Sequence, residues 1–453
     1  MSEQLQRRLT PRHITFMALG MCIGAGLFLG SASTIKLAGP SVLFAYVFGG
    51  AMIFVIMRAL GEMAAYEPIA GSFSAYAHKY LGPFAGYLTG WNYWILMMGV
   101  GIAESTAVGI YMKEWFPELP QWIWAFASVA MIGGLNLMAV KVYGELEFWF
   151  ALIKVLTVVL MILGGLAIIA LGWGNGGHPV GLSNLWTHGG WFPNGVVGMV
   201  LALPVLVFSF GGIETIGMAA AEAAQPERTI PRAVNSVIWR ILIFYIGSLF
   251  VIMAIYPWNE LGTQGSPFVS TFDKLGIPRA AALINFVVIT AALSSFNSTT
   301  FSGSRMLYSL ATQGQAPVSM RRLNSHGVPV RGVLVTIGCL LLGVLLNYLV
   351  PERIFGMIMS ILAFNTVWTW GTVLVAHWRF RRRQAEPLPF RLRLWPASSV
   401  LCLAFLAFVL VMLGYSADTR VALYVGVVWL ALLTVAYKLF GIDRRLRAAV
   451  AGA

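Results

Sequence analysis

GMCIGAGLFLGS, residues 20–31, lies at the centre of the first apolar stretch of the chain and contains four glycines in twelve residues. Each glycine disfavours a helix by about 1 kcal/mol relative to alanine. Inside a membrane, an unwound helix also leaves backbone N–H and C=O groups without partners, which is unfavourable by several kcal/mol per group. A span weakened in this way at its centre is expected to use its unwound backbone groups as a binding site.

The composition of the whole chain indicates a membrane protein. Of its 453 residues, 58% are apolar and only 10% are charged, and the mean hydropathy is +0.79. A soluble protein of this length would leave too much apolar surface in contact with water. Twelve apolar runs approach the ~20 residues needed to cross a bilayer. We therefore expect an all-α polytopic membrane protein with 12 transmembrane helices near 14–33, 41–64, 84–112, 121–140, 147–172, 196–221, 236–256, 279–310, 331–350, 354–377, 396–415 and 419–440.

The net charge is +13, and the placement of the basic residues indicates an orientation in the membrane. With the N-terminus in the cytoplasm, 23 lysines and arginines fall on the cytoplasmic side, 6 fall on the other side, and Lys154 lies inside a span. The positive-inside rule then places both termini in the cytoplasm. The tract WRFRRRQ (378–384) fits an orientation signal and a contact with anionic membrane lipid. This distribution argues against nucleic acid as a partner.

The sequence lacks the residues that several classes of function need. The start of the chain, MSEQLQRRLTPRH, has no signal-peptide layout, so we expect the first span to be kept. The sequence contains no Walker motif for an ATP-driven pump and no nucleophile–base pair at membrane depth for an intramembrane enzyme. Its 3 cysteines and 6 histidines have no metal-ligand spacing. We therefore expect a protein that is not an enzyme and that holds no metal and no cofactor.

A second span is interrupted at a corresponding place. VFSFGGIETIG (207–217) opens what would be a second group of five helices. Interruptions at matching positions of two halves are typical of transporters built from inverted repeats. Glycines in spans also permit close helix packing without any binding role, but two matching interruptions, one of them with an acid, favour the repeat. We expect one integral domain over 1–453, with repeats near 14–172 and 196–377 and extra helices near 396–440.

Together the two interruptions suit a zwitterion. If the first span unwinds at 23–26, the half-helix that follows presents free N–H groups and the positive end of its dipole to an anion. Carbonyl groups before this break and beside the second break suit an ammonium group. We therefore expect the two charged ends of an amino acid to be bound by Ile23, Gly24, Ala25, Gly26, Phe208, Ser209, Phe210 and Gly211.

Long stretches of the chain resemble one group of transporters. They are LGMCIGAGLFLGSA (19–32), IMRALGEMAAYEPIAGSFSAYA (56–77), GWNYW (90–94), KVYGELEFWFALIKV (141–155), FSFGGIE (208–214), AEAAQPERTIPRA (221–233) and NSTTFSGSRMLYSLATQGQAP (297–317). On these residues the chain resembles the amino-acid permeases of the amino acid–polyamine–organocation superfamily, specifically the bacterial amino acid transporter family.

The resemblance implies a fold and an activity. The fold is a LeuT-like 5+5 inverted repeat with broken helices 1 and 6 and two additional helices. The activity is import of an L-amino acid with a proton, which is the coupling ion, across the bacterial cytoplasmic (inner) membrane. The chain contains a full transport unit, so a monomer is sufficient.

Charged residues inside spans are rare and are candidates for function. Glu104 in span three either exchanges a proton or hydrogen-bonds a neighbouring helix, and the resemblance favours a place beside the substrate together with Ser105. Lys154 in span five either loses its proton during transport or stays charged and holds broken helix one. The resemblance suggests that its ammonium replaces the metal ion of sodium-coupled relatives. Glu214 either accepts backbone N–H groups of the second break or titrates, so these three residues are the candidates for proton coupling.

Two further features lie near the cytoplasmic side. Arg58 and Glu62 are four residues apart on one helical face, and we expect them to form a cytoplasmic latch. The segment SFSAYAHKYLG (72–82) has the pattern of an amphipathic helix lying at the interface.

The sequence leaves the substrate's side chain open. Phe208 is a candidate lid, Ser294 and Asn297 are candidates among the polar residues of span eight, and Trp368 is preferred over Asn365, Thr366 and Trp370 in span ten. Because no array of carboxylates awaits a dibasic side chain, a neutral or aromatic amino acid is favoured, while histidine, proline, serine and threonine stay open. The alternatives are an exchanger of two amino acids and a sensor that binds without transport.

Overall fold

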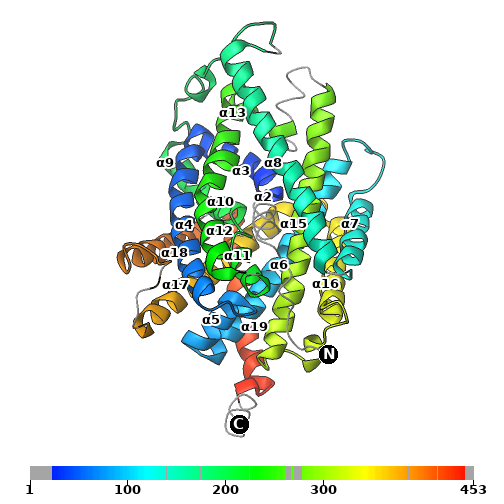
Figure 1. Cartoon of the computed structure of the whole chain (residues 1–453). Coiled ribbons are helices and arrows are strands. Elements are labelled where there is room, and N and C mark those ends of the chain that lie inside the picture. The colour runs from blue at the N-terminus through cyan, green and yellow to red at the C-terminus, as the bar shows by residue number, and fades with distance from the viewer. Residues whose placement is uncertain are drawn as a thin grey trace.

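The computed structural model of the chain is a bundle of helices that run mainly along one long axis (Figure 1). Among the described residues there is no β-strand, which confirms the expected all-α class. The structure describes residues 23–443 except 139, 174, 224, 262–266, 270–277, 353, 385–387, 389 and 416.

The first half of the described chain forms α2 (Ala25–Phe28), α3 (Gly30–Ala38), α4 (Val42–Tyr66), α5 (Ser72–Leu81), α6 (Pro83–Met112), α7 (Gln121–Asn136) and α8 (Val140–Leu171). The second half forms α9 (Gly195–Leu201), α10 (Leu203–Ser209), α11 (Thr215–Ala219), α12 (Pro226–Arg240), α13 (Ser248–Ile255), α15 (Pro278–Thr312), α16 (Val330–Leu349), α17 (Ile354–Arg383), α18 (Ala397–Tyr415) and α19 (Ala417–Leu439). A π-helical stretch, Ile241–Gly247, joins α12 to α13.

Nine stretches of the described residues are long and apolar enough to cross a membrane. One of them, 25–66, covers two predicted spans, because only a short 3₁₀ turn at Gly39–Ser41 separates α3 from α4. Two more predicted spans coincide with helices that are shorter, α7 and the pair α9–α10. The chain is therefore a multi-pass membrane protein. The count of twelve spans stays a prediction, and the start of the first span, 14–22, lies outside the described residues.

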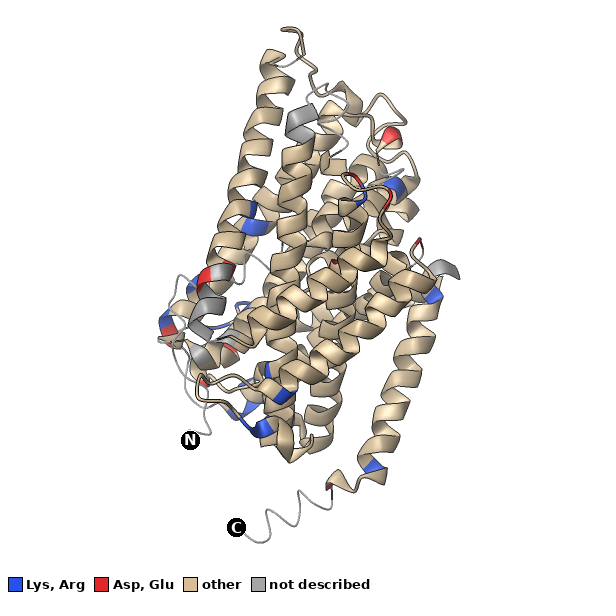
Figure 2. Ribbon diagram, turned by 90° about the vertical axis from the view of Figure 1, so that its right-hand side faces the viewer, with Lys and Arg blue, Asp and Glu red and all other residues tan. Residues whose placement is uncertain are grey.

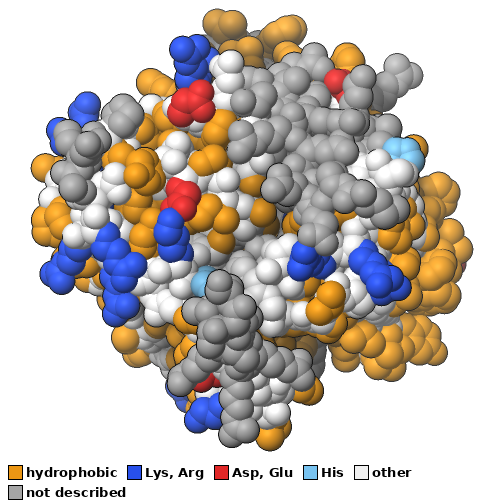
Figure 3. Space-filling view, turned by 60° about the horizontal axis from the view of Figure 1, so that its bottom comes forward, with side chains coloured by type: hydrophobic (Ala, Val, Ile, Leu, Met, Phe, Trp, Pro, Cys, Tyr) orange, Lys and Arg blue, Asp and Glu red, His pale blue; other side chains and the backbone are white. Residues whose placement is uncertain are grey.

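The outward faces of the helices carry large apolar side chains. Leu163 of α8, Leu342 of α16 and Val427 of α19 are each about 60% exposed, at 58%, 60% and 61%. Apolar surface of this extent in the middle of a helix is stable only against lipid. Charged residues gather toward the ends of the bundle (Figure 2). Figure 3, with the bottom of the molecule brought forward, shows Lys and Arg side chains on that face and apolar side chains around its rim.

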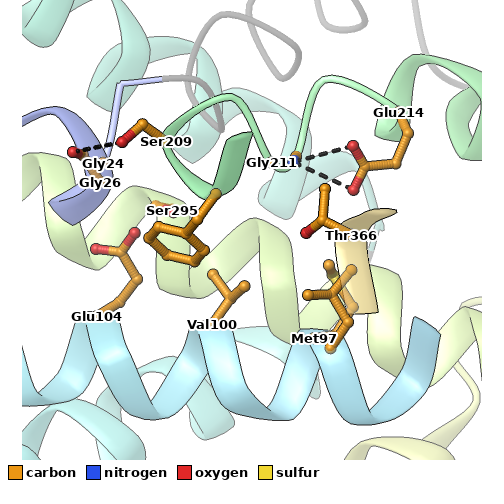
Figure 4. A pocket seen from close by; sticks show the side chains of 13 residues that line it. Gly24, Gly26, Met97, Val100, Glu104, Ser209, Gly211, Glu214, Ser295 and Thr366 are labelled. Atoms are coloured by element: carbon orange, nitrogen blue, oxygen red, sulfur yellow. Dashed lines mark hydrogen bonds between the residues drawn. The ribbon is translucent and has the colours of Figure 1, made fainter. Parts of the chain in front are cut away.

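Helix α6 lies at the centre of the packing. It contacts α5, α7, α15, α16 and α17, and it also contacts α2. In Figure 4 it runs along the lower side of the cavity. Gly82 starts it with φ +111°, a conformation that favours glycine, and Pro83 occupies its first turn, where its missing N–H is not needed. The turn at Gly82 also ends α5, which sets α5 against α6.

The predicted interfacial helix forms as α5, but it is more deeply packed than expected. Its residues Ser72 to Ala77 and Tyr80 are buried, and it contacts α6 and α17. Only its last turn, with His78 and Lys79, carries basic side chains. This helix therefore closes the lower end of the bundle.

Glu62 is the centre of a buried polar cluster rather than the partner of Arg58. Its carboxylate lies 2.6 Å from Arg381 Nε and 3.1 Å from His377 Nε2, and it accepts the N–H of Leu392 at 2.6 Å. Arg381 Nη2 also donates to the Leu392 carbonyl at 2.9 Å. The cluster joins α4, α17 and the segment that leads to α18.

Arg58 makes its contacts elsewhere. It donates to the carbonyl of Arg391 at 3.0 Å and to Asn235 Oδ1 at 2.8 Å, and its guanidinium lies 4.5 Å from the centre of the Phe390 ring. Arg58 and Glu62 thus each join α4 to residues 391–392, as a latch would, but through separate hydrogen-bond partners. The i, i+4 spacing puts both side chains on one face, but each finds a partner on another element.

Replacing Glu62 by alanine should destabilise the protein by about 3–5 kcal/mol, because Arg381 and His377 would lose a fully buried partner. Thermal unfolding of the purified protein in detergent measures this loss. The control is Glu67→Ala, which removes a pair with the exposed Lys79 (48% exposed) and should change stability by about 1 kcal/mol or less. Equal losses in the two variants would contradict the structural importance of the Glu62 cluster.

Candidate functional site

Among the described residues, the first helix of this span is α2, which starts at Ala25, next to the glycines that predict a break. Gly24 has an extended backbone (φ −131°, ψ −161°), and its carbonyl accepts the N–H groups of Leu27 and Phe28. The N–H of Ala25 donates to both carboxylate oxygens of Glu104, at 3.2 and 3.1 Å. A carboxylate of the protein thus occupies a position where we predicted the carboxylate of a bound amino acid.

The second predicted interruption is also seen. Helix α10 ends at Ser209 and α11 begins at Thr215, with Gly212 at φ +96° between them. The N–H of Gly212 donates to both oxygens of Glu214, each at 3.1 Å, and Trp370 Nε1 donates to the same carboxylate at 3.3 Å. Glu214 therefore accepts a backbone N–H of the second break, which is the first of the two roles considered for it from the sequence.

The two interruptions touch each other. Ser209 Oγ donates to the carbonyl of Gly26 at 3.0 Å. A Cβ atom on Gly26 would lie 3.0 Å from the Cα of Ser209 and 3.4 Å from the ring of Phe208. Only glycine allows the backbones to approach this closely.

A cavity lies between these two breaks and α6 (Figure 4). Six of the predicted substrate-binding residues line it, and so does Glu214. The lining residues are Gly24, Gly26, Leu96, Met97, Val100, Glu104, Phe208, Ser209, Gly211, Gly212, Glu214, Ser295 and Thr366. Glu104, Val100 and Met97 follow one another along α6, and Thr366 lies across the cavity from Met97.

Other predicted residues lie beside the cavity or face away from it. Ile23 is buried next to Gly24, and Ser105 donates to the carbonyl of Ile102 in its own helix at 3.0 Å. Phe210 packs against the rings of Tyr46 and Tyr245, at 5.5 and 4.8 Å between ring centres.

In span ten, Thr366 lines the cavity and Trp368 does not. Trp368 packs against a cluster that contains Tyr87 and Tyr437, on the side of α19. Thr366 and Trp368 are two residues apart, about 200° around α17, so they lie on opposite faces of the helix. The sequence has no signal that shows which face turns toward the cavity.

A buried acid that the sequence analysis did not single out lies behind the cavity. Glu147 of α8 accepts Ser294 Oγ at 2.6 Å and Asn297 Nδ2 at 3.4 Å, so the two predicted residues of span eight serve this acid and not the cavity. Lys154 is fully buried, and its charge acts on both Glu147 and Glu104. The signal was present, because Glu147 and Lys154 are seven residues apart, about two helical turns, and share one face of α8.

The carbonyl groups predicted to bind an ammonium already accept hydrogen bonds. The Phe208 carbonyl accepts the N–H of Gly211 at 2.7 Å, and the Ser209 carbonyl accepts the hydroxyl of Tyr245 at 2.7 Å. Each carbonyl has a second lone pair and can accept once more. The carbonyls of Met21 and Cys22 lie outside the described residues.

The site therefore offers backbone donors and acceptors, two carboxylates and an apolar wall within one cavity. Among the residues that the structure describes, no group of three His, Cys, Asp or Glu is placed to hold a metal ion. The groups present can bind a small zwitterion and exchange protons.

Comparison with known proteins gives the family. The family model for "Amino acid permease" matches residues 13–449. The chain is 52% identical over 451 residues to "Uncharacterized amino acid permease YtnA" of Bacillus subtilis, covering 99% of this chain and 97% of that protein. It is 48% identical over 450 residues to "Probable threonine/serine transporter YbxG" of Bacillus subtilis, covering 99% and 97%.

A further relative is "Aromatic amino acid transport protein AroP" of Shigella flexneri, 47% identical over 442 residues, with 96% of this chain and 95% of that protein covered. The match to the family model spans nearly the whole chain and includes both helix interruptions and the acids around them. The chain belongs to the amino acid permease family.

Proposed function

We propose that the protein is a secondary active transporter that imports an L-amino acid together with a proton by alternating access. The observation that carries the proposal is the cavity between two interrupted helices, in which a carboxylate already accepts the N–H of Ala25. Membership of the amino acid permease family supports an amino acid as the cargo.

In the proposed binding mode, the substrate carboxylate replaces that of Glu104 at the N–H of Ala25. The substrate ammonium then lies between Glu104 and the carbonyls of Phe208 and Ser209, which can each accept a second hydrogen bond. Gly24 keeps this end open, since a Cβ there would lie 2.5 Å from Glu104 Oε1. This part of the site thus binds only the carboxylate and the ammonium, which every amino acid carries.

The coupled proton is proposed to bind within the set Glu104, Glu147 and Lys154. Two carboxylates and one ammonium carry a net charge of −1 when all three are ionised, and one added proton makes the set neutral, which a buried site favours. A proton on Glu104 also weakens its hold on the Ala25 N–H and makes that group available to the substrate. Proton and substrate would therefore bind together. Glu214 is assigned to holding the second break.

The lining of the cavity suits a neutral or aromatic side chain, and its volume of about 20 Å³ means that the surrounding helices must move apart before an amino acid enters. Leu96, Met97 and Val100 form an apolar wall. In the proposed binding mode Glu104 faces the main-chain ammonium of the substrate, and Glu214 already accepts the N–H groups of Gly212 and Trp370, so neither carboxylate is left for a cationic side chain. Relatives named for aromatic amino acids and for threonine and serine support this class. We place the protein in the bacterial cytoplasmic membrane with both termini in the cytoplasm, and a monomer suffices for transport.

The test is uptake of each of the twenty radiolabelled amino acids by vesicles that contain the purified protein, with and without an inward proton gradient. Proton symport predicts that one or a few amino acids accumulate and that accumulation stops when the gradient is dissipated. Uptake that needs a preloaded amino acid and ignores the gradient would instead establish exchange. Binding without any flux would establish a sensor.

Lys154→Ala should abolish proton-driven accumulation while reducing equilibrium binding by less than about tenfold, because Lys154 acts on the two acids and does not line the cavity. Uptake and equilibrium binding measured on the same preparation separate the two effects. Lys113→Ala, at the exposed end of α6, is the control and should change neither. Accumulation that survives in Lys154→Ala would move coupling to other residues.

Gly26→Val should abolish substrate binding, because the added side chain would occupy the space beside the Cα of Ser209 and the ring of Phe208. The matched control is Gly164→Val in α8, where a Cβ meets nothing within 4 Å. Equilibrium binding of the transported amino acid measures both variants. Near-normal affinity in Gly26→Val would show that the substrate lies elsewhere.

A further inference from the structure

Thr366 presents its hydroxyl to the cavity from α17. The residue is fully buried, and its Oγ1 would lie 3.9 Å from a Cβ on Gly211, so it faces the unwound segment of the second break across open space. Figure 4 shows Thr366 above Met97 and away from Glu104. Its hydroxyl therefore lies at the end of the cavity farther from the proposed main-chain site.

The hydroxyls of the neighbouring threonines behave differently. Thr369 donates to the carbonyl of Asn365 at 2.9 Å and Thr372 to the carbonyl of Trp368 at 2.9 Å, each one turn back in the same helix. This is the usual way for a helix to satisfy a threonine. Thr366 Oγ1 makes no hydrogen bond to any residue that the structure describes. A fully buried hydroxyl without a partner is unfavourable, so this one is placed for a partner that enters the cavity.

The other polar side chains of the cavity have partners within the protein. Glu104 accepts the Ala25 N–H and Ser295 hydrogen-bonds to Glu104. Ser209 donates to the Gly26 carbonyl, and Glu214 accepts from Gly212 and Trp370. Among the described residues that line the cavity, Thr366 is thus the polar side chain whose hydrogen-bonding group is available to the substrate.

The direction of α6 shows which part of the substrate reaches Thr366. Met97 is seven residues from Glu104, roughly 10 Å along the helix at 1.5 Å per residue. A substrate whose charged groups lie near Glu104 therefore extends its side chain along Val100 and Met97 toward Thr366 (Figure 4).

We infer that Thr366 is a specificity-determining residue that hydrogen-bonds a hydroxyl group on the substrate's side chain. The inference rests on the proposed transport function and narrows its substrate to hydroxyl amino acids, the class of serine, threonine and tyrosine. A site built to hydrogen-bond a hydroxyl discriminates strongly against an analogue of the same shape that lacks it, because the protein's group is then left buried and unpaired. The hydroxyl amino acid whose side chain spans the distance from Glu104 to Thr366 should therefore bind more tightly than its apolar counterpart of the same shape.

The experiment compares pairs of nearly equal shape, threonine with valine and tyrosine with phenylalanine, so that size does not decide the result. Apparent affinities for all four are measured by competition against uptake of the best substrate into vesicles. In the wild type, the hydroxyl member of at least one pair should bind at least about tenfold more tightly. In Thr366→Val, which keeps the shape and removes the hydroxyl, that ratio should fall to about one.

Three further variants separate recognition from folding. Thr366→Ser keeps a hydroxyl and should keep the preference, whereas Thr366→Ala removes it without adding bulk and should lose the preference even if the valine variant fails to fold. Thr369→Val removes a hydroxyl that is buried in the same helix but bonded within it, and should leave the ratio unchanged. A wild type without preference in either pair, or a preference that survives both Thr366→Val and Thr366→Ala, would overturn the role of Thr366. A wild type that takes up no amino acid would instead overturn the transport function itself.

Discussion

The carboxylate of Glu104 accepts the N–H of Ala25 with both oxygens, at the first residue of α2. Backbone groups that lose their helical partners inside a membrane must find others, because neither lipid nor bulk water supplies them. The centre of this protein is organised around that requirement. Glu214 serves the second break in the same way, and Ser209 links the two breaks through the carbonyl of Gly26.

The same requirement explains why charged residues are concentrated behind the cavity. A buried carboxylate needs both hydrogen bonds and a nearby cation. Glu147 has Ser294 and Asn297, and the charge of Lys154 acts on both Glu147 and Glu104. One cation between two acids leaves a set whose total charge depends on a single proton. The cavity and the three charged residues beside it are thus parts of one electrostatic arrangement.

The helical class and most helix positions could be predicted from the sequence, because long apolar runs between charged or turn-rich segments leave few alternatives in a membrane. The glycines at 24, 26, 211 and 212 also predicted the positions of both breaks. Glycines destabilise a helix, so a cluster of them inside a span indicates a function for the unwound backbone. The partners of individual polar side chains could not be predicted. Trp368 and Thr366 are two residues apart on α17 but face α19 and the cavity respectively, and this depends on helix packing rather than on local pattern.

The separate partners of Arg58 and Glu62 could not be predicted for the same reason, and those of Glu62 have a mechanical consequence. Glu62 ties α4 to His377 and Arg381 of α17 and to the backbone of Leu392, all within a buried cluster. These three contacts to one buried carboxylate hold the elements together, since removing Glu62 would leave Arg381 without its ion-pair partner. The lower halves of α4 and α17 and the start of the segment toward α18 therefore form one rigid unit. Because α17 also carries Thr366, any tilt of that unit is transmitted directly to the wall of the cavity.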